Sequence, residues 1–398
     1  MTRCKLGDHI SIKHGYAFDG EFFSDQDNGI VLVTPGNFAM GGGYQEGKGK
    51  YYTGEYPAEF VLQPDDLIVT MTDLSKRIDT LGYGALVPSD GRVYLHNQRI
   101  GLVQLNDGQV DKYYLSCLMR SYDYQRSIAG SSTGSTVHHS SPKKICEYEF
   151  DLPPLETQRR IASILMAYDS LIENNRKQIA LLEEVAQRLY KEWFIDLRFP
   201  GHEDVEIVDG LPQGWSRVSI EELGNYLNGY AFKPSDHYRE GLPILKIREL
   251  KDGVGKDTPR NSGADVPERY RIHQGDIIFS WSATLAVDVW GEEDALLNQH
   301  LFKVTPRKAE AHEFVVQTLS SLVREMRGMT TGSTMSHLQR NKLKVIQTLM
   351  PSDEILEGYN AAASTLRKRI TSAKQSLKLA SEARDRLLPK LMSGEIEV

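Results

Sequence analysis

The segment Thr133-Gly134-Ser135-Thr136 returns 198 positions later as Thr331-Gly332-Ser333-Thr334. The same offset relates residue pairs on both sides of this segment, namely His139 and His337, Lys144 and Lys342, Pro153 and Pro351, Leu181 and Leu379, and Arg188 and Arg386. A period of roughly 200 residues is far too long for the unit of a solenoid, so it indicates a duplicated domain. Two similar modules on one chain suggest a target that itself has two parts.

Composition sets wide limits on the class of protein. The chain has 398 residues, of which 40% are hydrophobic and 25% charged, which is enough for two or three domains with real cores. No apolar run approaches the length of a membrane span, and the first residues lack the apolar stretch of a signal peptide. Cys4, Cys117 and Cys146 are odd in number and form no close pair, which argues against a disulfide framework and against a zinc site. We therefore expect a soluble cytoplasmic protein with no membrane contact.

The formal net charge of -7 argues against indiscriminate nucleic-acid binding, because Lys and Arg normally dominate the affinity for phosphates. It does not exclude DNA, since a subunit of a larger complex can leave part of the attraction to its partners. Lys143 and Lys144 in the first half, and Arg340 and Lys342 in the second, are basic groups at matched places. They are candidates for contacts to the DNA backbone, and the alternative is a solvated loop.

A long helix is predicted in each half. Apolar residues step by three and four from Ile161 to Leu189, and a second row, from Leu165 to Trp193, steps by seven beside them, which is the pattern of a coiled coil with a wide apolar face. Pro153-Pro154 opens this helix, and a second one, richer in alanine, covers residues 351–398. We expect the two helices to form an antiparallel coiled coil related by a pseudo-two-fold axis, with Asn175 and Gln178 in the seam.

The domains between the helices are predicted to mix sheet and helix, because turn residues lead repeatedly into short apolar runs. The expected fold class is therefore α+β. Its parts are a first domain at residues 1–152, a helix at 153–199, a second domain at 200–350 and a final helix at 351–398.

A search for catalytic motifs gives near misses. The run from Gly42 to Gly49 follows a P-loop pattern until its last position, where glycine replaces the Ser or Thr that binds Mg²⁺. Asp151-Leu152-Pro153-Pro154 lacks the aromatic residue that follows the prolines in adenine methyltransferase sites, and the histidines have no metal-ligand spacing. We predict no catalytic residue, cofactor or metal in this chain.

Three segments carry a resemblance to a known family. Residues 152–162 read Leu-Pro-Pro-Leu-Glu-Thr-Gln-Arg-Arg-Ile-Ala, residues 189–196 read Leu-Tyr-Lys-Glu-Trp-Phe-Ile-Asp, and residues 386–396 read Arg-Leu-Leu-Pro-Lys-Leu-Met-Ser-Gly-Glu-Ile. These segments resemble the conserved regions of the specificity subunits of Type I restriction-modification systems. One departure is the entry to the second helix, Met350-Pro351-Ser352-Asp353-Glu354, which lacks the fuller pattern of the first.

The resemblance implies a division of labour. Each domain would be a target-recognition domain that reads one half of a bipartite site in double-stranded DNA, and the helices would set the gap between the halves. Modification subunits would supply methylation dependent on S-adenosylmethionine, and a motor-nuclease restriction subunit would use ATP and Mg²⁺. This chain itself would be no enzyme. Two alternatives remain at this point: a coiled-coil scaffold that touches no DNA, and an enzyme that uses the Gly42 loop.

Residues that differ between matched loops are better candidates for base recognition than residues that repeat. Asn97 and Asn298 occupy the same place in both halves and cannot alone distinguish two half-sites, so we expect them to serve the fold. The DNA-binding candidates are Lys76, Arg77, Arg99, His138, His139, Lys143, Lys144, Lys246, Arg248, His300, His337, Arg340 and Lys342. The wide face of the first helix also predicts a contact with a modification subunit, for which the candidates are Leu165, Ile172, Trp193 and Phe194.

Changing both helices by one heptad tests their role as a spacer. Inserting or deleting seven residues in each preserves the seam and moves the domains by roughly 10 Å, at about 1.5 Å per residue. That distance equals about three base pairs, at roughly 3.4 Å each. Methylome sequencing should then show unchanged half-sites separated by a changed gap. An unchanged gap in a complex that still methylates would contradict the spacer role.

Overall fold

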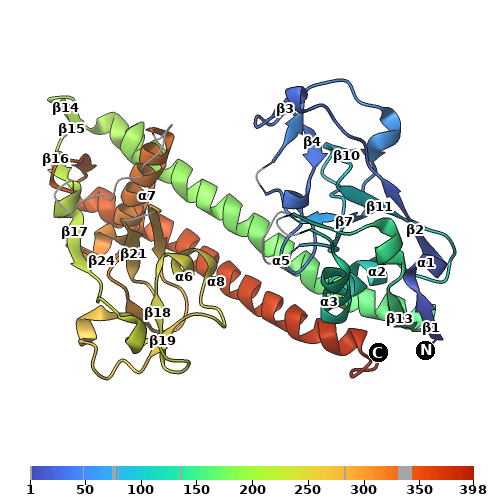
Figure 1. The fold of residues 1–398 in the computed structure, drawn as a ribbon. Helices are drawn as coiled ribbons and strands as arrows, with labels where there is room; N and C mark the ends of the chain where they lie inside the picture. Colours follow the sequence, from blue (N-terminus) through green and yellow to red (C-terminus); the bar gives the residue numbers. More distant parts are fainter. Residues whose placement is uncertain are drawn as a thin grey trace. The chain divides into compact units, whose positions relative to one another are not determined.

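The computed structural model describes residues 2–47, 49–73, 78, 80–134, 137–281, 284–329 and 343–398. Its contacts divide the chain into two units, which are Met1–Leu171 together with Ala380–Val398, and Ile172–Leu379. The division cuts both long helices, so each unit holds one sheet-containing domain and a stretch of each helix (Figure 1). Within the described residues no helix is long and apolar enough to cross a membrane.

The first unit contains small sheets of mixed direction. The strands of one pair are β1 (Thr2–Lys5) and β13 (Glu149–Leu152), which run antiparallel. An antiparallel sheet has the order β2 (Ile10–His14), β11 (Ile100–Leu105), β7 (Leu67–Thr70) and β9 (Gly84–Leu86). A further sheet has the order β3 (Phe23–Ser24), β5 (Tyr51–Tyr52), β4 (Ile30–Val33), β10 (Val93–His96) and β6 (Val61–Leu62), with β4 and β10 parallel. Strands β8 (Thr72–Asp73) and β12 (His138–His139) form one more antiparallel pair.

Short helices connect these strands, and the side chain of the preceding residue caps α2 and α4. They are α1 (Leu6–His9), α2 (Lys112–Leu118), α3 (Tyr122–Ser131) and α4 (Pro142–Cys146). The Asp111 side chain accepts hydrogen bonds from the backbone N–H groups of Tyr113 and Tyr114, which satisfies donors that the start of a helix leaves free. Buried Tyr114 and Ile145 then join the core of the unit.

The second unit repeats this plan. One antiparallel pair is β16 (Ser216–Ser219) with β25 (Gln347–Met350). A second sheet has the strand order β17 (Gly224–Asn228), β24 (Leu301–Pro306), β21 (Ile277–Ser280) and β22 (Ala286–Val289). A third sheet has the strand order β19 (Arg260–Asn261), β18 (Leu242–Leu245), β23 (Ala295–Leu297) and β20 (Arg271–Ile272). A small hairpin, β14 (Ile207–Val208) with β15 (Leu211–Pro212), precedes them, and the helices are α6 (Ile247–Asp252) and α7 (His312–Met329). β18 and β23 are parallel, as β4 and β10 are in the first unit.

Matched glycines show why the fold needs the repeated residues. Asn97 forms a bridge with Tyr16, and Asn298 forms the same bridge with Tyr230. A Cβ added at Gly15 would lie 2.2 Å from the Asn97 carbonyl oxygen, and one at Gly229 would lie 2.2 Å from that of Asn298. Only glycine fits so close an approach of two backbones. Both asparagines are buried, and the Asn97 side chain accepts a hydrogen bond from the backbone N–H of Arg99 at 3.1 Å, which is the structural role predicted for it.

The long helices are α5 (Leu155–Tyr190), which continues as a five-residue π-helix at Lys191–Ile195, and α8 (Asp353–Met392). Two mixed domains joined by long helices confirm the predicted fold class. Gln158 fixes the start of α5, because its buried side-chain amide donates to the carbonyl oxygens of Pro153 and Gln109 and accepts from the backbone N–H of Asp111.

Within each unit, the two helices pack against each other. In the first unit, Leu165 of α5 shares a core with Leu391 of α8. In the second, the Asn175 amide donates to the Ser376 hydroxyl at 3.2 Å, and the Phe194 ring lies 4.8 Å from that of Tyr359, between centroids. In the second unit the partner residue in α8 moves back from Ser376 to Tyr359 as the chain advances from Asn175 to Phe194, so the two helices run antiparallel.

The predicted seam needs one correction. Asn175 is buried against α8 as expected, but Gln178, Leu171 and Val185 are exposed. The second apolar row is buried more consistently, at Leu165, Ile172 and Ala186, whereas the first row is buried only at Ile161 and Asn175. Two rows one helical step apart differ by about 100° around the axis, and the sequence gives their spacing but not which of them meets a partner.

Candidate nucleic-acid interface

Three loops of the first unit meet at the end of its antiparallel sheet. The backbone N–H of Met71, just beyond β7, donates to the Arg99 carbonyl oxygen, and its own carbonyl oxygen accepts from the backbone N–H of Ser140. These two hydrogen bonds hold Arg99 and the strand His138–His139 on either side of Met71. Arg99 and His139 are exposed there, so the structure brings these sequence candidates together.

A tight turn holds the two histidines. Thr133 and His139 exchange two backbone hydrogen bonds, and β12 pairs with β8 so that His139 lies opposite Thr72. Gly134 has φ +109°, and a Cβ there would lie 2.0 Å from the Val137 carbonyl oxygen. Thr133 and Gly134 thus have a structural role in the first domain. His139 also contacts the Thr72 hydroxyl through Nδ1 at 3.1 Å.

The matched region of the second unit carries different side chains. His300 is exposed where β23 turns into β24, and its ring lies 6.4 Å from that of Trp281, between centroids. The Leu245 carbonyl oxygen accepts from the backbone N–H of Asn298, which brings Lys246 to the same turn. Burial and the nearby Lys246 ammonium lower the pKa of His237, whose Nε2 lies 3.5 Å from Lys246 Nζ. Arg248, on α6, is exposed.

The two lysines before the first long helix differ in their surroundings. Lys143 has a side chain that is 86% exposed, with only a 3.9 Å contact to Glu147. The Lys144 ammonium donates instead to the carbonyl oxygen of Ser131, the last residue of α3. A cation at that place also interacts favourably with the end of a helix. Lys143 is therefore available to a phosphate, whereas Lys144 has a structural contact.

Lys76, Arg77, His337, Arg340 and Lys342 lie outside the described residues, so their predicted contacts stay predictions.

The four residues assigned to a partner subunit lie within the chain's own packing. Leu165, Ile172 and Phe194 are at most 2% exposed, and Trp193 is half-buried against Tyr359. The premise that α5 has apolar surface to spare on this face was wrong, because the chain's own two domains cover the two ends of the face and α8 packs along it.

Among the described residues of the glycine loop, Gly42 and Gly43 do not have the arrangement of a phosphate cradle, in which backbone N–H groups point at the ligand. The N–H of Gly42 donates to the Ala39 carbonyl oxygen, and the N–H of Gly43 donates to that of Gly84. These donors are engaged inside the domain. These contacts do not support the P-loop motif on which the enzyme alternative depended.

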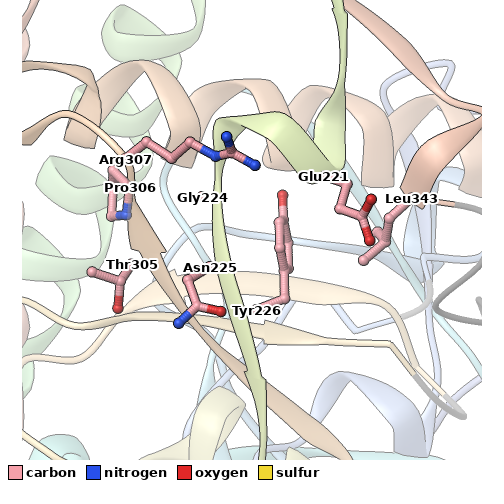
Figure 2. Close-up of a pocket in the computed structure, with 8 residues that line it drawn as sticks. All are labelled: Glu221, Gly224, Asn225, Tyr226, Thr305, Pro306, Arg307 and Leu343. Carbon is pink, nitrogen blue, oxygen red and sulfur yellow. The ribbon is translucent and has the colours of Figure 1, made fainter.

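A cavity of about 520 Å³ lies at the edge of the second unit's sheet (Figure 2). Glu221, Tyr226 and Arg307 are among its lining residues, and the Tyr226 hydroxyl donates to the Ile220 carbonyl oxygen at 2.7 Å. None of the sequence candidates lines this cavity, and we assign it no part in recognition.

Comparison with known proteins agrees with this geometry. The model of a family described as the Type I restriction modification DNA specificity domain matches residues 2–184 and 212–362, one stretch in each repeat. The chain belongs to this family. The MjaIX specificity subunit of a Type I restriction enzyme from Methanocaldococcus jannaschii is 27% identical over 323 residues, covering 76% of this chain and 73% of the relative. The HindI specificity subunit from Haemophilus influenzae is 23% identical, covering 79% and 86%.

A solved structure has the same fold. It is the S subunit of the Type I restriction-modification system from M. genitalium, with a TM-score of 0.65, 16% identity, and coverage of 98% of this chain and 96% of that one. At this identity the likeness shows the fold alone.

Lys143 and Lys144 provide a matched pair of alanine variants. Lys143→Ala should lower the slope of log affinity against log salt by about one, equally for all DNA sequences. Lys144→Ala should leave that slope unchanged and lower the free energy of unfolding by about 1 kcal/mol, the value of one hydrogen bond. DNA-binding titrations of the assembled complex at several salt concentrations, with urea unfolding of the isolated chain, measure both. A change in the methylated bases in either variant would contradict these roles.

Proposed function

We propose that this chain is the DNA-recognition subunit of a Type I restriction-modification complex and that its two domains, at residues 1–152 and 200–350, each read one half of a bipartite double-stranded site. The helices at 153–199 and 351–398 hold the two domains at a fixed spacing. The observation that carries the proposal is the family match, which falls separately on each of two repeats. A scaffold that never touches DNA does not account for that match.

The loops at the sheet ends are where the two half-sites are distinguished. Arg99 stands at this place in the first domain, and His300 with Lys246 in the second. An arginine can bond guanine through two N–H groups, whereas a histidine offers one donor or acceptor at a time. Different side chains on the same backbone frame read different bases.

The chain recognises DNA and leaves the chemistry to other subunits. Modification subunits bring S-adenosylmethionine, and a restriction subunit brings ATP and Mg²⁺. The cytoplasm is where such a complex meets DNA.

Exposed apolar residues on the helices are the docking sites that we propose for the modification subunits. Leu181 and Val185 are one turn apart on α5, and they are 62% and 48% exposed. Leu379 on α8, which is matched to Leu181 by the repeat, is 67% exposed. Large apolar side chains at equivalent places on both helices suit a partner that binds each half alike.

Exchanging the second domain tests the division of the site. Residues 204–350 are replaced by the corresponding residues of another family member, and cells carrying the chimera with the modification subunit are analysed by methylome sequencing. One half of the methylated sequence should change while the other half and the gap persist. Changes in both halves, or in neither, would contradict the assignment of one half to each domain.

Placing a charge on the exposed helix face tests docking. Leu181→Lys should weaken binding of the modification subunit at least about tenfold, because a buried leucine contributes roughly 1.5–3 kcal/mol and about 1.4 kcal/mol corresponds to a factor of ten. Ile207→Lys is the control, since Ile207 is 58% exposed but lies outside both helices. Affinity is measured by calorimetry with the purified subunits. Equal affinities of both variants and the wild type would exclude this face as the contact.

A further inference from the structure

Three charged groups from separate elements meet where the first domain contacts the two long helices. The guanidinium of Arg120, just beyond α2, donates from Nη1 to Asp169 Oδ2 at 2.6 Å and from Nη2 to Oδ1 at 3.3 Å. Arg384 of α8 donates to Oδ1 of the same carboxylate at 3.0 Å. The Arg120 side chain is only 5% exposed. We call Arg120, Asp169 and Arg384 the Arg120 clamp, because it connects the domain to both helices within the first unit.

The glycine loop is part of the same arrangement. The third donor of Arg120, Nε, bonds the Gly41 carbonyl oxygen at 3.0 Å. Gly42 has φ +85°, and a Cβ there would lie 2.2 Å from Arg120 Cγ and 2.7 Å from Cδ. Gly42 therefore leaves the space through which the arginine passes. The loop that resembled a P-loop forms one wall around a side chain.

The second unit has a clamp at the matched helix position with the charges reversed. Arg367 of α8 lies 198 residues after Asp169 of α5, the offset of the repeat. Its Nε donates at 3.2 Å to Glu313 of α7, whose side chain is 4% exposed. Both domains thus contact the same point of their helix through a buried charge, although the residues have changed. An incidental ion pair gives no reason for this recurrence.

Such a clamp supplies what apolar packing lacks. Burial of apolar surface is non-directional, whereas a guanidinium fork on a carboxylate fixes both position and angle. Burial alone would raise the pKa of Asp169, but hydrogen bonds from Arg120 and Arg384 outweigh it and hold the pKa below its usual value. The carboxylate is therefore charged, and the fork is charge-assisted.

We propose that Arg120 is a positioning residue, which holds the first recognition domain on the helices so that the gap between half-sites is read to a single base pair. This inference rests on the proposed function and adds to it the residue that sets the tolerance of the gap. Discrimination of one base pair requires the domain to be held within about 3.4 Å. The two directional, buried hydrogen bonds from the Arg120 guanidinium to Asp169 are suited to hold the domain within that distance.

The test uses the complex of the full chain with its modification subunit. Its substrate is a DNA library in which both half-sites are fixed and the gap varies by single base pairs. The variants are Arg120→Met, which keeps the length of the side chain and leaves Asp169 paired with Arg384; Arg120→Lys, which keeps the charge without the fork; and Gly42→Ala, which displaces Arg120 without removing it. Arg3→Met is the control, because it removes exposed ion pairs with Glu149 and Asp151 in the same unit.

We expect the ratio of methylation at the correct gap to methylation at gaps one base pair longer or shorter to fall about tenfold in Arg120→Met and Gly42→Ala, since misplacement by about 1 Å can change rates on the order of 100-fold. Arg120→Lys should fall between these variants and the wild type, and Arg3→Met should match the wild type. Gly42→Ala should add little to Arg120→Met, because both act through one side chain.

Equal loss of methylation at every gap, in parallel with a lower melting temperature, would overturn the proposal and leave the clamp a merely stabilising contact. Altered half-site bases would also overturn it. If Arg120→Met does not fold, Gly42→Ala and Arg120→Lys decide the matter by the same ratio. A wild-type complex that ignores the half-sites would instead refute the proposed function, and the positioning role with it.

Discussion

The apolar face of a 36-residue helix has to leave water, and the rest of this structure depends on how that face of α5 is covered. In the first unit, Ile161 and Leu165 join a core made by the first domain and the end of α8. In the second, Tyr190 and Phe194 join a core made by the second domain and the start of α8. Each large side chain contributes roughly 1.5–3 kcal/mol when buried, whereas a hydrogen bond such as that of Asn175 to Ser376 contributes about 1 kcal/mol. Burial therefore supplies the stability, and the polar contacts fix the register.

The duplicated domains share a backbone frame, and the exposed side chains beside that frame differ between them. Gly15 and Gly229 recur because the asparagine backbones at Asn97 and Asn298 leave no room for a Cβ. Two residues past each asparagine, Arg99 in one domain corresponds to His300 in the other, and both are exposed. Residues under a steric constraint recur in both domains, and exposed residues two positions away differ. In the proposed function, this separation would let one fold serve two different half-sites.

The sequence predicted the long helices well, because heptad spacing and the prolines at residues 153 and 154 act locally. It also predicted the duplication and the structural role of Asn97. It failed where the answer depends on distant residues. The sequence showed that the apolar face of α5 is wide. It did not show that the chain's own domains cover Leu165 and Phe194. Arg120 and Asp169 are 49 residues apart and follow no local pattern, so their contact had no signal except the reversed charge at the matched position, Arg367. The sequence predicted that Lys144 contacts a DNA phosphate, yet its ammonium donates a hydrogen bond to the backbone carbonyl oxygen of Ser131.

Several cations of this acidic chain are engaged inside it, and this bears on how affinity for DNA is divided in the complex. Besides Arg120 and Arg367, Lys374 lies 2.8 Å from Asp288, and Lys303 lies 2.7 Å from Asp276. A cation held by a carboxylate releases little counterion when a phosphate approaches, so these residues add little to sequence-independent binding. With a formal charge of -7, the chain is suited to bind DNA weakly by charge and selectively by contact. In the proposed complex, the partner subunits supply the general attraction to DNA. A DNA site with the wrong spacing would then gain little binding energy from this subunit, because the proposed base contacts depend on the correct sequence at the correct spacing.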